Sequence, residues 1–209
     1  GIIGPGTYHE LEKYLLGYAV YRIRRGDNLY RIARRFRTGV DRILAANPDI
    51  RPLGLQVGRR IVIPYAFDVV DTNINYTYDV LQRDIEGLAA RYPFLETGSA
   101  GRSVLNRKLS YIRLGRGKNR VFYNAAHHAL EWITSPVLMK FIEGFSKAYA
   151  FGGNIGGFDP RDIWQKSSIY IIPMVNPDGV DLVLNGLSPE NPYFDELIGW
   201  NKVNDEFST

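Results

Sequence analysis

Apolar and polar positions follow a regular order in the first third of the chain. Residues 21–24 alternate apolar and Arg positions, as in a half-buried strand that stops at a Gly-Asp turn signal. Apolar residues then recur at helical spacing over residues 29–36 and again over residues 40–46, where an Asn-Pro pair ends the pattern. Residues 61–64 (IVIP) predict a closing strand. The pattern therefore predicts a strand–helix–helix–strand unit.

A different alternation of elements begins near residue 76. Apolar residues at helical spacing predict an amphipathic helix, which stops at a Tyr-Pro pair. These apolar residues are Val80, Leu81, Ile85, Leu88 and Ala89. Strand-like runs follow at residues 108–114 and 120–125, a long helix is predicted over residues 135–150, and residues 168–173 form another apolar strand. Strands that alternate with helices predict an α/β layer structure.

The composition is typical of a chain that folds around a core. The 209 residues, 45% hydrophobic and 23% charged, suffice for one large domain or two smaller ones. No apolar run approaches the roughly 18 residues of a membrane span, so none is expected. Cys is absent, so a bound metal ion would depend on His, Asp or Glu.

The net charge of +4 is unevenly distributed. Residues 21–64 contain 11 Arg against three Asp, a charge of +8, which leaves −4 for the rest. Such a basic block could bind nucleic acid or an anionic cell wall, or it could form a solvated face. We do not expect nucleic-acid binding, because no known nucleic-acid motif accompanies the charge.

Three His are present, and two of them follow a strand that its apolar sequence predicts to be buried. They are His127 and His128, with Glu131 close behind; the third is His9. A His and a Glu three residues apart share one face of a helical turn and can hold zinc. A plain His–Glu hydrogen bond at a helix start is the alternative.

The strand–helix–helix–strand unit resembles a LysM module. The resemblance rests on residues 21–33 (YRIRRGDNLYRIA), 43–48 (ILAANP) and 55–64 (LQVGRRIVIP), with Asn28 where Thr or Ser is commoner. It implies binding of N-acetylglucosamine-containing glycans between two loops, at Gly26, Asp27, Asn28, Leu29, Tyr30, Asn47, Pro48, Asp49 and Ile50. Leu29 and Ile50 would pack on sugar faces. Alternatively, Asp27, Asn28 and Asn47 only cap helices.

The rest of the chain, from Tyr76 onward, resembles the zinc carboxypeptidases. The matching motifs are residues 101–107 (GRSVLNR), residues 128–133 (HALEWI) after a strand, and residues 173–179 (PMVNPDG). In the first of these Asn106 replaces the more usual Gly, and Asn is the next-best residue for a left-handed turn.

This resemblance implies a mixed-sheet α/β domain and a zinc site. The implied ligands are His128 and Glu131; His127 would orient the site and Trp132 would wall its pocket. Zinc would polarise the scissile carbonyl and activate the attacking water, assisted by a Glu general base.

The sequence around the implied ligands narrows the substrate. Leu130 stands where true carboxypeptidases usually carry Arg, and residues 127–132 (HHALEW) look more like the bacterial branch that cuts γ-D-glutamyl–diaminopimelate bonds in peptidoglycan stem peptides. The family's third zinc ligand, its substrate-binding Arg residues and its catalytic Glu are expected beyond Thr209. We therefore expect this chain to be inactive alone. The alternative is a non-catalytic peptidoglycan-binding protein on a peptidase-like scaffold.

The chain is thus expected to contain four parts. Residues 1–8 (GIIGPGTY) and Leu11 resemble the closing motif of a small helical peptidoglycan-binding domain, so residues 1–19 would be its remnant. The others are a LysM module (20–65), a linker (66–75) and the N-terminal half of a zinc carboxypeptidase-like domain (76–209). Residues 152–157 (GGNIGG) lack the Gly-Lys-Ser/Thr ending of a phosphate-binding loop and predict a flexible loop beside the active cleft.

Overall fold

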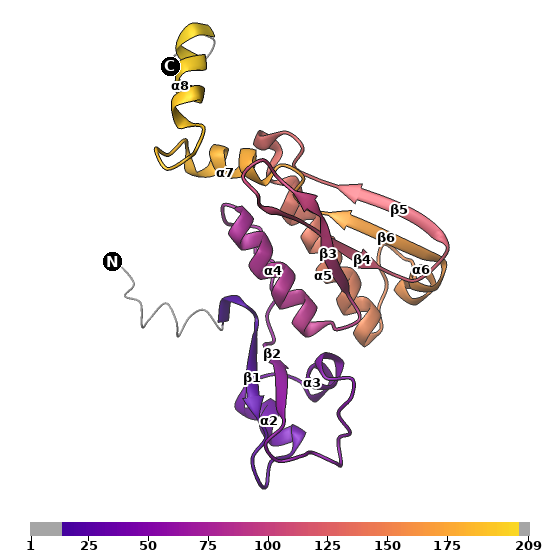
Figure 1. Cartoon of the computed structure of the whole chain (residues 1–209). Coiled ribbons are helices and arrows are strands. Elements are labelled where there is room, and N and C mark those ends of the chain that lie inside the picture. Colours follow the sequence, from indigo (N-terminus) through magenta and orange to yellow (C-terminus); the bar gives the residue numbers. More distant parts are fainter. Residues whose placement is uncertain (1–13, 205–209) are drawn as a thin grey trace.

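The computed structural model describes residues 14–204 and shows a small N-terminal module below a larger α/β part (Figure 1). His9 and most of the proposed helical remnant lie outside the described residues. The small module has the predicted order of strand, helix, helix and strand: β1 (Tyr18–Arg22), α2 (Leu29–Arg35), α3 (Val40–Ala46) and β2 (Arg60–Pro64). β1 pairs antiparallel with β2 from Tyr18↔Pro64 to Arg22↔Arg60, so it begins earlier than the apolar alternation predicted.

The larger part is a mixed sheet with helices, as expected. Its strands lie in the order β3 (Glu96–Arg102), β4 (Lys108–Leu114), β6 (Ser167–Ile172) and β5 (Asn119–Asn124). β4 runs antiparallel to β3 and β6, whereas β5 and β6 are parallel. The helices are α4 (Tyr78–Arg91), α5 (Thr134–Phe151), α6 (Pro160–Lys166), α7 (Pro177–Asn185) and α8 (Phe194–Asn204), with a short 3-10 turn, η1 (Ala129–Glu131), before α5.

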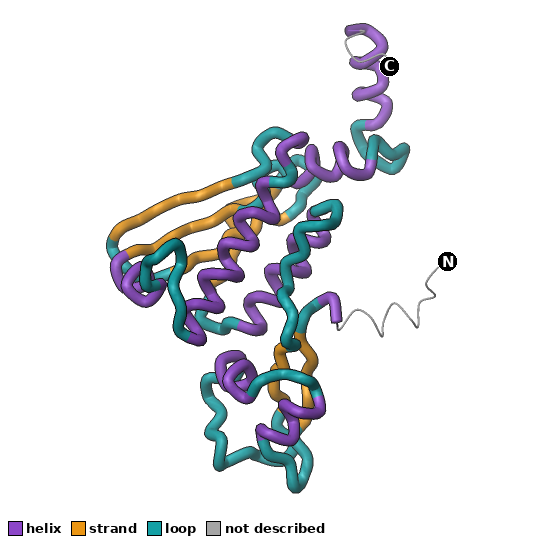
Figure 2. The backbone as a smooth tube through the Cα atoms, turned by 180° about the vertical axis from the view of Figure 1, so that it is seen from behind, coloured by secondary structure: helices purple, strands orange, loops and turns teal. Residues whose placement is uncertain are grey.

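The main core lies between the sheet and the helices α4 and α5, which cover the same face of the sheet (Figure 2). Its fully buried side chains include Tyr76, Leu88, Ile112, Phe145 and Ile171. A second, smaller core fills the N-terminal module between its strands and helices. Within residues 14–204, no helix is both long and apolar enough to cross a membrane.

Two expectations about the surroundings of the histidines are wrong. β5 is not a buried strand: it lies at the edge of the sheet, and Phe122 and Tyr123, consecutive residues that point to opposite faces, are 56% and 47% exposed, so both faces of the strand are open there. The glycine-rich loop is not beside the histidines either. It follows the C-terminal end of α5, whereas the histidines precede the N-terminal end, and an 18-residue helix separates the two by about 27 Å.

Candidate metal centre

The parallel pairing of β5 and β6 brings together the loops that follow them. The two strands end side by side at Asn124↔Ile172. The ladder continues into the loops, where the Val175 and Asn176 amides donate to the carbonyls of Ala125 and Ala126, each at 3.0 Å. The carboxyl ends of parallel strands are where ligands tend to bind in α/β sheets.

The backbone just before the histidines has an uncommon conformation. Ala126 has φ of 51°, in the left-handed region that residues other than Gly seldom adopt. The Thr134 hydroxyl accepts from the Ala126 amide at 3.0 Å and donates to the Glu131 carbonyl at 2.7 Å. On the other side, the Asn176 side chain donates to the His127 carbonyl at 3.2 Å. These bonds hold a strained turn, and strain of this kind clusters at functional sites.

The structure brings the predicted pair His128 and Glu131 together. His128 is the residue before η1 and Glu131 ends it, so one tight turn separates them. Their Nδ1 and Oε1 atoms are 3.0 Å apart, and the side chains are 83% and 55% exposed. An imidazole nitrogen and a carboxylate oxygen this close together are a donor set that zinc accepts. The residues present therefore fit a zinc ion, as two of its ligands.

Other predicted members of the site have different contacts. His127 Nε2 bonds Asn124 Oδ1 at 2.7 Å, at the end of β5, and not the ligand pair. Trp132 is half-buried and packs against the main core. Among residues 14–204, no cluster of three or more His, Cys, Asp and Glu side chains is placed to hold a metal ion.

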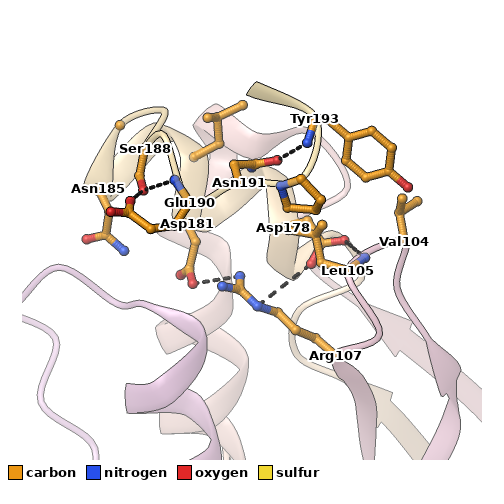
Figure 3. A pocket seen from close by; sticks show the side chains of 13 residues that line it. Val104, Leu105, Arg107, Asp178, Asp181, Asn185, Ser188, Glu190, Asn191 and Tyr193 are labelled. Carbon is orange, nitrogen blue, oxygen red and sulfur yellow. Dashed lines mark hydrogen bonds and ion pairs between the residues drawn. The ribbon is translucent and has the colours of Figure 1, made fainter. Parts of the chain in front are cut away.

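The other two carboxypeptidase-like motifs meet at the start of α7, as Figure 3 shows. The Asp178 carboxylate accepts from Ser103 Oγ and from the Leu105 amide, both at 2.9 Å. Arg107 forms an ion pair with Asp181 at 2.6 Å and donates to the Pro177 carbonyl at 3.0 Å. These bonds join the loop between β3 and β4 to α7. The turn between β3 and β4 contains Asn106 at φ of 63°, which confirms the left-handed turn predicted there.

A hollow of about 580 Å³ lies over this cluster. Residues from the β3–β4 loop, α7 and the segment after α7 line it (Figure 3): Val104, Leu105, Arg107, Asp178, Asp181, Leu182, Asn185, Gly186, Ser188, Glu190, Asn191, Pro192 and Tyr193. Sequence reasoning did not single out Asp181, although its position three residues after Asp178 places both carboxylates on one face of α7.

In the N-terminal module, several predicted glycan-binding side chains have structural contacts. Asn28 Oδ1 caps α2 by accepting from the Arg31 amide at 2.8 Å, and Asp27 accepts from the Arg24 amide and the Tyr21 hydroxyl. Asn47 is buried and bonds the backbone of α3 and β2 three times. The capping alternative thus describes the contacts of Asn28 and Asn47, whereas Asp27 closes the turn before α2 and does not cap a helix.

The other predicted glycan-binding residues differ in burial: some belong to the core of the module and others are exposed. Leu29 and Ile50 belong to the small core, at 4% and 8% exposed; Leu29 is therefore not available to pack on a sugar face, whereas Ile50 also lines a hollow and its contact with a sugar stays a prediction. Apolar side chains in so small a module are needed for its core. Tyr30 is 70% exposed, whereas Asp49 and Ile50 line a hollow of about 260 Å³ with Ile23, Arg51, Gly54, Leu55, Gln56 and Arg59. Asp49 forms an ion pair with Arg59 there. Gly26 and Pro48 lie in the turns before α2 and after α3.

Comparison with known families identifies both parts of the chain. The sequence model of the zinc carboxypeptidase family matches residues 81–203, and that of the LysM domain matches residues 21–64. The chain belongs to the zinc carboxypeptidase family and carries a LysM domain N-terminal to the family region. Both resemblances drawn from the motifs are confirmed.

Individual proteins and solved structures are similar to parts of the chain. The chain is 36% identical over 238 residues to gamma-D-glutamyl-L-diamino acid endopeptidase 1 of Lysinibacillus sphaericus, covering 89% of the chain and 60% of that protein. It is 33% identical over 135 residues to the uncharacterized protein YqgT of Bacillus subtilis, covering 64% and 36%. Among solved structures, bovine thrombin-activatable fibrinolysis inhibitor in complex with tick carboxypeptidase inhibitor matches with 28% identity, a TM-score of 0.43, and coverage of 52% and 33%. The chain spans at most 60% of the length of these proteins.

Proposed function

We propose that the protein is a zinc-dependent peptidase of the bacterial cell wall that hydrolyses γ-D-glutamyl–diaminopimelate-type bonds in peptidoglycan stem peptides. The observation that carries the proposal is the exposed His128–Glu131 pair at the carboxyl end of β5, in a chain that also has a LysM domain. The name of the Lysinibacillus sphaericus relative, an endopeptidase for gamma-D-glutamyl-L-diamino acid bonds, supports the substrate class.

In this proposal His128 and Glu131 hold the metal ion, with further ligands and the general base from beyond Thr209. Zinc bound there would supply Lewis-acid polarisation of the scissile carbonyl. His127 acts as a positioning residue, because its ring bonds Asn124 and its carbonyl accepts from Asn176, which fixes the backbone directly before His128. Trp132 anchors the same turn to the core.

The residue between the two ligands is consistent with an internal peptide bond as the target. Leu130 is 79% exposed and lies between His128 and Glu131. A side chain with no charge at this position offers no partner to the free carboxylate at the end of a peptide, whereas an Arg side chain can pair with one. The apolar surface instead suits the methylene groups of a γ-linked glutamyl residue.

The non-catalytic alternative has one observation in its favour: within residues 14–204 the ligand pair is not joined by a third metal-binding side chain. Hydrolysis separates the two proposals. A γ-D-glutamyl–diaminopimelate peptide incubated with zinc and the protein, extended past Thr209 to the length of its relative, should release a new amino group. Failure of that protein to cleave any stem peptide, with zinc bound, would leave the scaffold alternative.

We further propose that the LysM domain binds N-acetylglucosamine-containing glycan through its exposed polar surface around Tyr30 and Asp49. The 209-residue chain is expected to sediment with insoluble peptidoglycan, also at about 0.5 M salt. Ions at that concentration screen the Arg-rich surface severely, so binding that persists there comes from contacts with the glycan and not from charge. Asp49→Ala should weaken sedimentation, whereas Arg116→Gln, a change of an exposed residue in the other part, should not. Binding that disappears in salt would instead assign the interaction to charge alone.

A further inference from the structure

We infer that the LysM domain and the carboxypeptidase-type domain form one rigid body, joined at Arg91, in which α4 holds the glycan-binding surface at a fixed distance from the metal centre. The consequence for function, which rests on the function proposed above, is that the sugar bound by the LysM domain is not the sugar whose peptide is cut. Three features of the described residues carry this inference: a buried Arg anchor, a close backbone contact and a clamped connecting segment.

The anchor is a buried cation at the C-terminal end of α4. Arg91 is only 3% exposed. Its Nε and NH2 atoms donate to the Gly17 carbonyl, directly before β1, at 3.0 and 2.5 Å, and its NH1 donates to the Phe67 carbonyl, just after β2, at 2.7 Å. One guanidinium thus binds both chain segments that enter and leave the LysM domain. Its removal would leave two carbonyl groups without these donors, which is costly in a buried place.

The backbone of α4 approaches the segment that enters the LysM domain so closely that only Gly fits. A Cβ atom added to Gly87 of α4 would lie 2.5 Å from the Leu16 carbonyl oxygen and 3.0 Å from Val69. Gly17 has φ of 73°, and a Cβ atom there would lie 2.7 Å from Arg91 NH2. Gly in the middle of a helix costs stability relative to Ala. The presence of Gly87 within α4 is therefore explained by this contact.

The segment between the two domains is fixed at residues 68–70. Val69 and Val70 are buried, and the Val69 amide donates at 2.6 Å to the carboxylate of Glu143, which is itself only 1% exposed. Lys140 bonds Asp68, the Val70 carbonyl and Glu143 within 3.1 Å. The segment proposed as a linker thus packs against α5 and does not act as a free hinge.

α4 reaches from this anchor to the cluster of motifs near the metal centre. At its N-terminal end the Tyr78 amide donates to Asp181 at 3.1 Å, and the Arg107 guanidinium lies 5.3 Å from the centre of the Tyr78 ring. A helix of 14 residues places these two ends about 20 Å apart. The LysM domain and α7 accordingly lie beyond opposite ends of α4 in Figure 1.

The glycan-binding surface lies farther away still. The Tyr18 end of β1 contacts α4, since the Tyr18 hydroxyl bonds Glu86 at 3.1 Å. The hollow that contains Asp49 includes Ile23 and Arg59, which are paired beyond the other end of the β1–β2 ladder. A peptide attached to a bound sugar would need about six fully extended residues to span even 20 Å. A shorter stem peptide cannot reach from the bound sugar to the metal centre, so the enzyme would cut peptides attached to other sugars of the polymer.

Two variants test the rigid connection in different ways. Arg91→Met removes the hydrogen bonds and keeps the bulk of the side chain, whereas Gly87→Ala keeps Arg91, favours the helix and wedges the domains apart. Arg116→Gln is the matched control, because it removes an exposed charge that takes no part in the bonds between the domains. ¹⁵N relaxation and residual dipolar couplings of the 209-residue chain measure whether residues 21–64 and residues 78–185 share one alignment tensor.

We expect one shared tensor for the unaltered chain and for Arg116→Gln, and separate tensors for the two variants. Separate tensors in the unaltered chain would overturn the inference, as would a single, unshifted tensor in every variant that folds. If Arg91→Met fails to fold, Gly87→Ala decides alone. In the active protein, the preference for intact wall over a soluble stem peptide should fall at least about tenfold in both variants, with glycan sedimentation unchanged. Absence of any hydrolysis would count against the proposed function and leave the tensor result standing.

Discussion

His128→Ala and Glu131→Ala are each expected to abolish zinc binding and hydrolysis of γ-D-glutamyl–diaminopimelate peptides. The reason is geometric: the two donor atoms lie 3.0 Å apart on one turn, so either change leaves a single ligand at this edge of the sheet. Zinc sites in proteins normally have three or four protein ligands. Residues 14–204 place only these two side chains at the site, so the 209-residue chain should bind zinc weakly, and the protein extended to the length of its relative should bind it tightly. Competition against a chromophoric chelator measures both affinities.

His127→Ala is the matched comparison for these two changes. Its ring contacts Asn124 and not the ligand pair, so its loss should loosen the turn without removing a ligand. Partners of this kind typically contribute about 10- to 100-fold in affinity or activity. If His127→Ala eliminates zinc binding while His128→Ala retains it, the ligand assignment is wrong. Hydrolysis by the 209-residue chain alone would refute the expectation that further catalytic groups are needed.

Local signals in the sequence were sufficient for the LysM domain and for the proximity of His128 and Glu131. Asn28 caps α2 and Asn106 takes a left-handed turn, because both outcomes depend on a few neighbouring residues. His128 and Glu131 meet for the same reason, since one 3-10 turn contains them. In each case the relevant contact is short-range, and the residue type alone limits the backbone to few conformations.

Features that depend on distant pairing were not predictable. The sequence of β3 (ETGSAGR) has no apolar alternation, and it forms a strand because β4 pairs with it from Glu96↔Arg113 onward. The apolar run of β5 predicted a buried strand, but its place at the sheet edge follows from strand order, which periodicity does not encode. α7 is absent from the predicted elements, although Asn176 caps it and Pro177 stands at its first position.

The role of Arg91 could not be predicted from the sequence for the same reason. In the sequence it is one basic residue in the last turn of a helix, a position where a cation is favourable in any exposed helix. Only the folded chain shows that Gly17 and Phe67, 74 and 24 residues away, supply its partners.

Asp84→Asn is expected to change the pH dependence of stability more than any other single substitution of a buried carboxyl group in the core. Asp84 lies on the buried face of α4 and is fully buried, and this burial raises its pKa to about 6, against the opposing effects of the Tyr76 hydroxyl at 2.8 Å and of Arg83 at 3.1 Å. The nearby Glu143 carboxylate raises the pKa further. In the unfolded chain the same group titrates near its ordinary value of 3.8.

The sign follows from proton binding. Between about pH 4 and pH 6 the folded state holds the Asp84 proton and the unfolded state does not, so stability falls as pH rises through this window. A difference of about two pKa units corresponds to roughly 3 kcal/mol, present in full below pH 4 and lost above pH 6. The Asn side chain accepts the Tyr76 hydrogen bond without carrying a charge. Asp84→Asn should therefore remove the loss of stability between pH 4 and pH 6. At pH 7 its gain is reduced by the lost contact with Arg83.

Urea unfolding at pH values from 3.5 to 8, followed by tryptophan fluorescence, measures this difference, because Trp164 is buried in the same core as Tyr76. Other groups titrate in the acid range: the Asp68 carboxylate, paired with Lys140 and Lys147, has a pKa lowered to about 2 and gives the opposite slope. Subtraction of the variant's curve from that of the unaltered chain cancels these contributions and isolates Asp84. The expected difference curve rises in favour of Asn across pH 4 to 6 and is flat on both sides. A flat difference across the whole range would show that Asp84 ionises in the folded chain as it does in the unfolded one, and that Arg83 and Tyr76 fully offset its burial.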